Sequence, residues 1–173
     1  MSAHGVAVLA GTARPSFLAL TPVCVFLGVA AASRMPAGPG GYALLSLVIA
    51  GAILAHVSVN MLNEYEDFRN GLDLRTVRTP FSGGSGTLPQ RPEAARAVMQ
   101  VGWLALGGTL LIGATLLYYR GAGLLPLGLL GLLLVGTYST HIVRWPLASL
   151  VAPGLGFGPL MVMGTAFVVP GEH

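Results

Sequence analysis

The chain has 173 residues, of which 54% are hydrophobic and only 9% are charged, and its mean hydropathy is +0.75. Soluble domains carry about 25% charged residues, so this composition excludes a water-soluble domain. The net charge of +3 is too small and too scattered to indicate nucleic-acid binding. Cys24 is the single cysteine, which excludes an internal disulfide and a cysteine metal site.

Five apolar segments follow one another along the chain and predict an all-α, polytopic membrane helical bundle. A helix needs about 17–25 apolar residues to cross the hydrocarbon core of a bilayer. The second, third and fifth segments reach this length unaided, whereas the first and fourth need flanking residues. The five segments are Phe17–Ala32, Tyr42–Leu62, Ala97–Tyr119, Leu124–Tyr138 and Trp145–Val169.

Two of these segments have features with more than one interpretation. The first resembles a secretory signal peptide, because Arg14 precedes it and small residues follow it, but Pro22 and the long stretch before Arg14 argue against this interpretation. In the fifth, Gly154 and Gly158 are spaced as a GxxxG pair. This spacing either predicts a close helix crossing or simply reflects the high glycine content.

The charges are concentrated between the second and third segments. Ten of the fifteen Asp, Glu and Arg residues lie between Leu62 and Ala97, and we expect a loop over residues 63–96 within a single membrane domain of residues 1–173. If the five segments alternate across the membrane, this loop shares one side with Arg14 and Arg144, and that side holds seven of the nine arginines. The positive-inside rule then places the N-terminus and the loop in the cytoplasm, at the cell inner (plasma) membrane.

A polar stripe begins inside the second segment and enters the loop. If the helix continues through the stripe, four of its side chains lie within about 60° of one another, at 100° per residue. The four are His56, Asn60, Asn63 and Asp67. Polar groups within a membrane are costly and usually functional, although His56 is also explained as a core histidine bonded to a backbone carbonyl. The carboxylates are also explained as a solvated helix end, but the two amides above them favour a site.

The residues around and after the stripe suit a metal ion and a diphosphate. Glu64 and Glu66 flank the stripe, and Asp73 lies beyond Gly71, where the chain can turn back. Carboxylates without thiols favour Mg²⁺, which binds through one or two carboxylates together with substrate phosphates. Arginines and a glycine-rich loop follow, and both types of group bind phosphate oxygens. The sequence therefore predicts a metal–diphosphate site at a membrane surface.

These residues resemble a known motif. Asn63-Glu64-x-x-Asp67, Asp73, Arg78-Thr79 and Gly83-Gly84-Ser85-Gly86 resemble the first aspartate-rich motif and following loop of the UbiA family of intramembrane prenyltransferases. The glycine-rich loop and the Asp73 spacing are most similar to the 1,4-dihydroxy-2-naphthoate polyprenyltransferase branch of menaquinone biosynthesis. The similarity extends over nearly the whole chain.

The resemblance implies Mg²⁺-dependent transfer of a polyprenyl group from a polyprenyl diphosphate to an aromatic acceptor within the lipid bilayer. Its implied catalytic residues are Asp67, Asp73 and Arg78. Its implied metal ligands are Asn63, Glu64, Asp67 and Asp73. Its implied substrate-binding residues are Arg14, Asn60, Arg75, Arg78, Ser85, Tyr138, Ser139 and Arg144.

The sequence also departs from the family pattern. Glu64 stands where the family commonly has Asp, and after Asp73 the only acidic residues are Glu93 and Glu172. Family members have about nine helices in two halves, each with an aspartate-rich motif. We therefore expect this chain to be the N-terminal half of such a fold, incomplete for catalysis without a C-terminal half or a partner chain. The alternatives are a non-catalytic prenyl-diphosphate-binding protein or pseudo-enzyme, and a cation transporter that uses the Asn60–Asp67 stripe.

Overall fold

The computed structural model describes residues 3–32, 35–75, 84–138, 141–142 and 145–169, and throughout these residues the regular elements are helices. This confirms the predicted all-α class. The elements in chain order are α1 (Ala3–Ala13), α2 (Pro15–Leu18), α3 (Leu20–Ala31), α4 (Gly38–Arg69), α5 (Thr87–Gln90), η1 (Pro92–Ala94), α6 (Ala95–Arg120), η2 (Ala122–Leu124), α7 (Leu125–Tyr138), α8 (Pro146–Leu155), η4 (Gly156–Leu160) and α9 (Met161–Val168).

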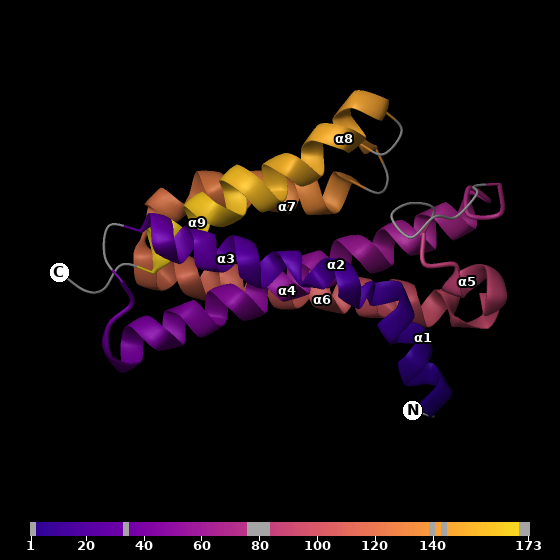
Figure 1. Cartoon of the computed structure of the whole chain (residues 1–173), viewed down its shortest axis with the longest axis horizontal. Helices are drawn as coiled ribbons and strands as arrows, with labels where there is room; N and C mark the ends of the chain where they lie inside the picture. Colours follow the sequence, from indigo (N-terminus) through magenta and orange to yellow (C-terminus); the bar gives the residue numbers. More distant parts are fainter. Residues whose placement is uncertain (1–2, 33–34, 76–83, 139–140, 143–144, 170–173) are drawn as a thin grey trace.

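The long helices lie lengthwise beside one another, and α1 diverges from them at one end (Figure 1). α4 packs mainly on α6, and α3 packs on α9. Glycine permits the closest approach of α3 and α9, because a Cβ added to Gly28 would lie 2.5 Å from Thr165 Cβ. A Cβ on Gly154 or Gly158 would meet no described atom within 4 Å, so this GxxxG pair does not make the close crossing.

Three helices are long and apolar enough to cross a membrane, and this number rises to four if α1 and the α2–α3 segment, which are bent by 48°, form one span. A further apolar helix, Ala122–Tyr138, is shorter. The three spans are Gly38–Arg69, Pro92–Arg120 and Leu147–Val168. Each of the five predicted segments thus corresponds to a helix, and the chain is an integral membrane protein.

The fifth predicted segment is one helix with a π-helical turn in its middle. This turn, η4, separates α8 from α9; it contains Pro159, and Pro153 lies three residues before it in α8. Proline has no N–H to continue the ordinary helical hydrogen bonds, which accounts for the irregular turn here. One side chain of this turn, Phe157, packs against His56 of α4, with ring centroids 4.5 Å apart.

Two hydrophobic clusters stabilise opposite parts of the bundle. The first joins α3, α4, α6 and α9 near the end of the bundle that carries the C-terminus, and the second joins α1, α4, α5 and α6 near the other end. Buried members of the first are Val25, Val48, Leu116, Leu124 and Val168. Buried members of the second are Ala13, Met61, Leu88 and Val98. The second cluster fixes the helix ends that surround the polar stripe.

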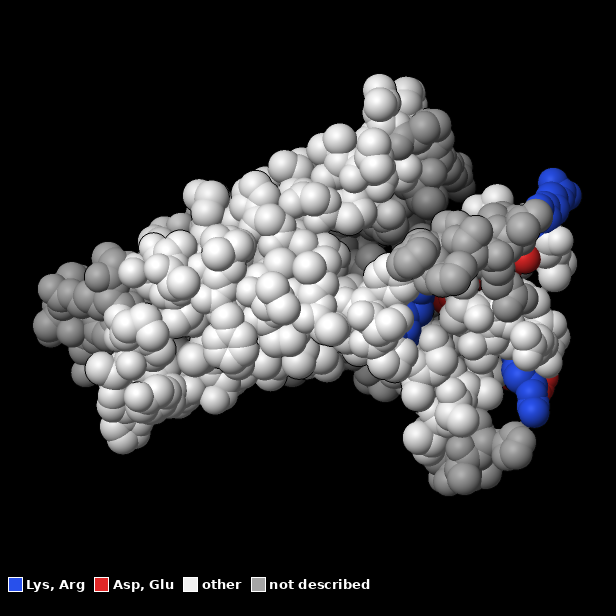
Figure 2. Space-filling model, viewed as in Figure 1, with Lys and Arg blue, Asp and Glu red and all other residues white. Residues whose placement is uncertain are grey.

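Charged side chains gather at this second end. In Figure 2 the coloured Arg, Asp and Glu side chains all lie toward this end, around the end of α4, the start of α6 and the α1–α2 junction, and the remaining visible surface of the described residues is uncharged. The segment 63–96 opens with the last two turns of α4 and closes with α5 and η1. We call this region the polar end of the bundle.

Candidate functional site

α4 continues without a break to Arg69, which confirms the condition under which the polar stripe was predicted. The stripe faces the junction of α1, α2 and α3. The His56 ring bonds through Nδ1 to the Thr21 hydroxyl at 2.8 Å, and Asn60 Nδ2 donates to the carbonyl of Ala13 at 2.9 Å. The partner of His56 is therefore a side chain of a neighbouring helix and not the backbone carbonyl that a core histidine would use.

Asn63 and Asp67 form the centre of the site. Asn63 Nδ2 donates a hydrogen bond to Asp67 Oδ2 at 2.7 Å, across one turn of α4. Asn63 Oδ1 is buried and has no hydrogen-bond partner among the described residues. A buried amide oxygen without a partner is costly in a folded protein. Here it lies beside a carboxylate, so a bound cation would find two oxygen ligands in one place.

Asp73 returns toward α4 through a Schellman turn. Gly71 adopts a left-handed conformation (φ 70°), its N–H donates to Phe68 O at 3.1 Å, and the Leu72 N–H donates to Asp67 O at 2.9 Å. The Asp73 N–H also donates to Asp67 O at 3.4 Å, and the Asp73 side chain is buried. The turn predicted at Gly71 is therefore present. It ends α4 and brings Asp73 back against its last turns.

Arg14 separates α1 from α2 in a strained backbone conformation. Its φ of 54° is the one positive value found for a non-glycine among the described residues, and the left-handed region costs about 1–2 kcal/mol for such a residue. Asn60 stabilises the break, because it binds the carbonyl that α1 leaves exposed at Ala13. The guanidinium lies over the Phe17 ring, 4.4 Å from its centroid, and acts electrostatically on the Asp67 carboxylate.

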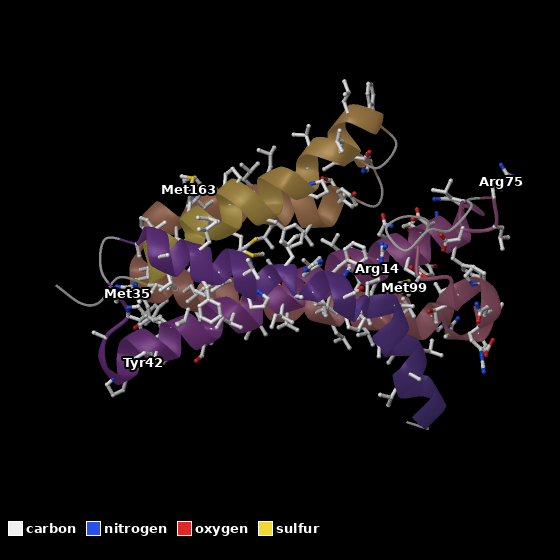
Figure 3. The ribbon with its side chains drawn as sticks, viewed as in Figure 1. Arg14, Met35, Tyr42, Arg75, Met99 and Met163 are labelled. Atoms are coloured by element: carbon white, nitrogen blue, oxygen red, sulfur yellow. The ribbon has the colours of Figure 1, made fainter. Side chains whose placement is uncertain are left out.

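The other predicted substrate-binding residues differ in position. Tyr138 ends α7, and its hydroxyl donates to Ser149 O at 3.4 Å. Arg75 is exposed at the outer tip beyond α4, well separated from Arg14 (Figure 3). Three predicted residues lie outside the described part of the chain, namely Arg78, Ser139 and Arg144.

Glu64 and Ser85 connect α4 to the glycine-rich loop. Glu64 is only 2% exposed, the Ser85 N–H donates to its Oε2 at 2.9 Å, and the Ser85 hydroxyl donates to its Oε1. The loop also approaches Asp73, since a Cβ on Gly84 would lie 2.6 Å from Asp73 Oδ1. Both carboxylates thus contact the loop.

The donor chemistry of the site suits Mg²⁺. Among the described residues, no group of three or more His, Cys, Asp or Glu side chains is placed to hold a metal ion by itself. Mg²⁺ seldom needs such a cage, since it binds through one or two carboxylates, waters and substrate phosphates. Asn63 Oδ1 and the Asp67 carboxylate offer ligands of this kind, so the residues present fit the ion.

The sequence interpretation missed three residues around the site. Thr21 binds His56, Phe157 packs on the same ring, and Thr87 bonds to Ser85. A signal for Thr21 was available, because a polar side chain in an apolar span needs a partner of its own. No comparable signal exists for Phe157, since its contact depends on the bend at η4.

Comparison with protein families matches the chain to the UbiA prenyltransferase family over residues 8–172. No curated protein and no solved structure matches the chain. The matched range includes Arg14, the polar stripe, the glycine-rich loop and Tyr138. On this match over almost its whole length, the chain belongs to the UbiA family of prenyltransferases.

Proposed function

We propose that this chain binds a polyprenyl diphosphate at the polar end of the bundle and takes part in Mg²⁺-dependent transfer of its prenyl group to an aromatic acceptor. The observation that supports this most directly is the buried Asn63 Oδ1, which lacks a protein partner and lies beside Asp67. Family membership supports prenyl transfer in general. The acceptor that we propose is 1,4-dihydroxy-2-naphthoate, on the likeness of the glycine-rich loop and the Asp73 spacing.

The proposed ligands of the metal are Asn63, Asp67 and Asp73. Bound Mg²⁺ would supply charge neutralisation for the departing diphosphate. In the reaction, the bond between C1 of the allylic chain and the diphosphate oxygen breaks, and the electron pair leaves with the diphosphate. An electron-rich carbon of the acceptor ring then bonds to C1, and the ring loses a proton.

The protein's own groups have separate proposed roles. Arg14 would attract the diphosphate or an acidic acceptor, since its guanidinium suits bidentate contacts with oxyanions. Tyr138 would contact the bound substrate from α7. The apolar helices would hold the prenyl tail and exclude water from the allylic cation. We also retain Arg75, Arg78, Ser85, Ser139 and Arg144 as proposed substrate contacts.

The orientation that we propose places the polar end in the cytoplasm, at the inner membrane. The described arginines of the segment 63–96 lie at this end, whereas Arg120 ends α6 at the other. An excess of arginine marks the cytoplasmic side. We further propose that turnover requires a second carboxylate cluster, from a C-terminal half or a partner chain, because Glu93 and Glu172 are the only acidic residues after Asp73.

The test is binding of farnesyl diphosphate to the full chain in lipid nanodiscs, with and without Mg²⁺. We expect Mg²⁺-dependent binding that Asp67→Asn weakens at least tenfold, and no change with Glu66→Gln as the control, because Glu66 pairs with Arg69 at 3.5 Å outside the site. Binding without turnover would indicate a chain that needs its partner or a non-catalytic binder. Mg²⁺ flux in liposomes that Arg78→Ala leaves unchanged, without diphosphate binding, would instead establish a transporter.

A further inference from the structure

Glu64 lies in the aspartate-rich motif, at the edge of the polar stripe of α4. At 100° per residue it is about 40° from Asn60 and about 60° from Asp67 around the helix. The side chain is almost fully buried. A buried carboxylate must be compensated by hydrogen bonds or a counter-charge, and the contacts of Glu64 show which of these it has.

Both carboxylate oxygens of Glu64 receive hydrogen bonds from Ser85. The Ser85 N–H donates to Oε2 at 2.9 Å, and the Ser85 hydroxyl donates to Oε1. Hydrogen bonds to an ionised acceptor are stronger than bonds between neutral groups. The side chain therefore joins α4 to one residue of the loop through two bonds, which fixes both the backbone and the side chain of that residue.

The contact continues from Ser85 into the next helix. The Thr87 N–H donates to Ser85 Oγ at 3.1 Å, and the Ser85 and Thr87 hydroxyl oxygens are 2.7 Å apart. Thr87 begins α5, and the next residue, Leu88, is fully buried in the cluster that includes Ala13 and Met61. The loop is thus attached by a polar contact at Glu64 and by an apolar contact at Leu88.

The attached loop touches two parts of the proposed site. Gly84, with φ 70°, lies directly against the Asp73 carboxylate. Thr87 lies against α1, since a Cβ on Gly11 would be 2.8 Å from Thr87 Oγ1. A shift of Ser85 would therefore move Gly84 relative to Asp73 and would move Thr87 relative to α1, the helix that precedes Arg14.

We propose that Glu64 is a positioning residue that holds the Gly84–Thr87 loop against the site, and that it is not a ligand of the metal. The inference rests on the proposed function, because it assigns a role within the diphosphate site. Both Glu64 oxygens accept bonds from Ser85, so the carboxylate is directed toward the loop. The length of glutamate also has a reason here, since aspartate at this position would end one methylene short of Ser85.

The experiment compares Glu64→Gln, Ser85→Ala and the double variant with Asp67→Asn, each as the full chain in lipid nanodiscs. Hydrogen exchange of the amides in residues 84–90 reports loop anchoring and needs no substrate. Farnesyl diphosphate binding across a Mg²⁺ titration reports the metal site. Glu66→Gln is the matched control, because it removes a neighbouring carboxylate that pairs with Arg69 and not with the loop.

We expect Glu64→Gln and Ser85→Ala each to speed exchange in residues 84–90 at least tenfold, and the double variant to add little. Both should weaken farnesyl diphosphate binding while the Mg²⁺ concentration for half-maximal binding stays within twofold of the original value. Asp67→Asn should raise that Mg²⁺ concentration at least tenfold and leave loop exchange unchanged. If the effects of Glu64→Gln and Ser85→Ala on binding add in the double variant, the two residues do not act through one contact, and the proposal is overturned.

The inference is overturned if Glu64→Gln raises the Mg²⁺ requirement as Asp67→Asn does while exchange in residues 84–90 stays unchanged. The proposed function fails separately, if the original chain binds no farnesyl diphosphate at any Mg²⁺ concentration. In that event the hydrogen-exchange measurement still shows whether Glu64 anchors the Gly84–Thr87 loop. Unchanged exchange in both single variants would reject it, and faster exchange in both would support it.

Discussion

Asn63 donates from Nδ2 to Asp67 Oδ2 at 2.7 Å, and this one bond fixes which end of the Asn63 amide faces the site. The donor is used by Asp67, and the acceptor, Oδ1, remains buried without a described partner. The arrangement places two oxygen atoms of the kind that hard cations prefer one helical turn apart. It also has a cost in stability, which leads to the first prediction.

Asn63→Leu should weaken farnesyl diphosphate binding much more than it changes the stability of the fold. The substitution removes a buried oxygen that has no partner and also the 2.7 Å bond to Asp67; these effects oppose each other, so we expect the free energy of unfolding to change by no more than about 1–2 kcal/mol. Because that bond orients Asp67, Mg²⁺-dependent farnesyl diphosphate binding should fall at least tenfold. Thermal unfolding in detergent and a binding titration check the two effects, with the exposed Asn70→Ala as control. Parallel losses of stability and binding would contradict this account of Asn63.

Gly84→Ala and Gly71→Ala form a matched pair. Both glycines have φ 70°, so alanine at either position incurs a similar backbone cost of about 1–2 kcal/mol. Only at Gly84 would the added Cβ collide with Asp73, at 2.6 Å from its Oδ1, whereas nothing lies within 4 Å at Gly71. We expect a larger loss of diphosphate affinity for Gly84→Ala, measured at equal fractions folded. Equal losses would show that the Asp73 contact has no role in binding.

Gly28→Ala should separate α3 from α9. Its Cβ would lie 2.5 Å from Thr165 Cβ and 2.7 Å from Val162 O, and overpacking of this kind costs about 1–3 kcal/mol. Gly154→Ala is the control, because no described atom lies within 4 Å of its added Cβ. Thermal unfolding should show a lower midpoint for Gly28→Ala alone. A midpoint unchanged from the original chain would mean that α3 and α9 are not packed as described.

Removal of a buried hydroxyl should have opposite effects on stability at Ser58 and at Thr21. Ser58 Oγ is buried without a described partner, so Ser58→Ala should be neutral or stabilising by up to about 1 kcal/mol. Thr21→Val keeps the shape of the side chain but removes the 2.8 Å bond to His56, and it should destabilise by about 0.6–2 kcal/mol. Unfolding in the same detergent compares the two. A stability loss for Ser58→Ala equal to that for Thr21→Val would show that Ser58 has a partner.

Much of the fold was predictable because its cause is local. Apolar length alone identified the five segments, and helical spacing placed His56, Asn60, Asn63 and Asp67 on one face of α4. The turn at Gly71 also follows from local chemistry, because glycine adopts the left-handed conformation that ends a helix. These predictions needed no knowledge of how the helices pack.

The remaining features depend on contacts between distant segments. The helix α1 was not predicted, since its apolar residues number too few for a span and its position is set by packing on α4 and α5. The bonds from Ser85 to Glu64 join residues 21 positions apart, and the sequence between them does not specify the pairing. The close crossing at Gly28 likewise depends on Thr165, and the sequence pattern drew attention only to Gly154 and Gly158, for which it left two interpretations open.

The length of α4 has a consequence for how a ligand reaches the site. Its 32 residues extend about 48 Å, and the hydrocarbon core is about 30 Å thick, so roughly a third of the helix lies beyond the acyl chains. Asn63 and Asp67 follow the apolar stretch Tyr42–Leu62, so we expect them to lie at the depth of the lipid headgroups. An amphiphile with an anionic head and an apolar tail would reach them by two-dimensional diffusion within the leaflet. Its occupancy would then follow its mole fraction in the membrane, and dilution of the sample with buffer at constant lipid composition would leave that occupancy unchanged.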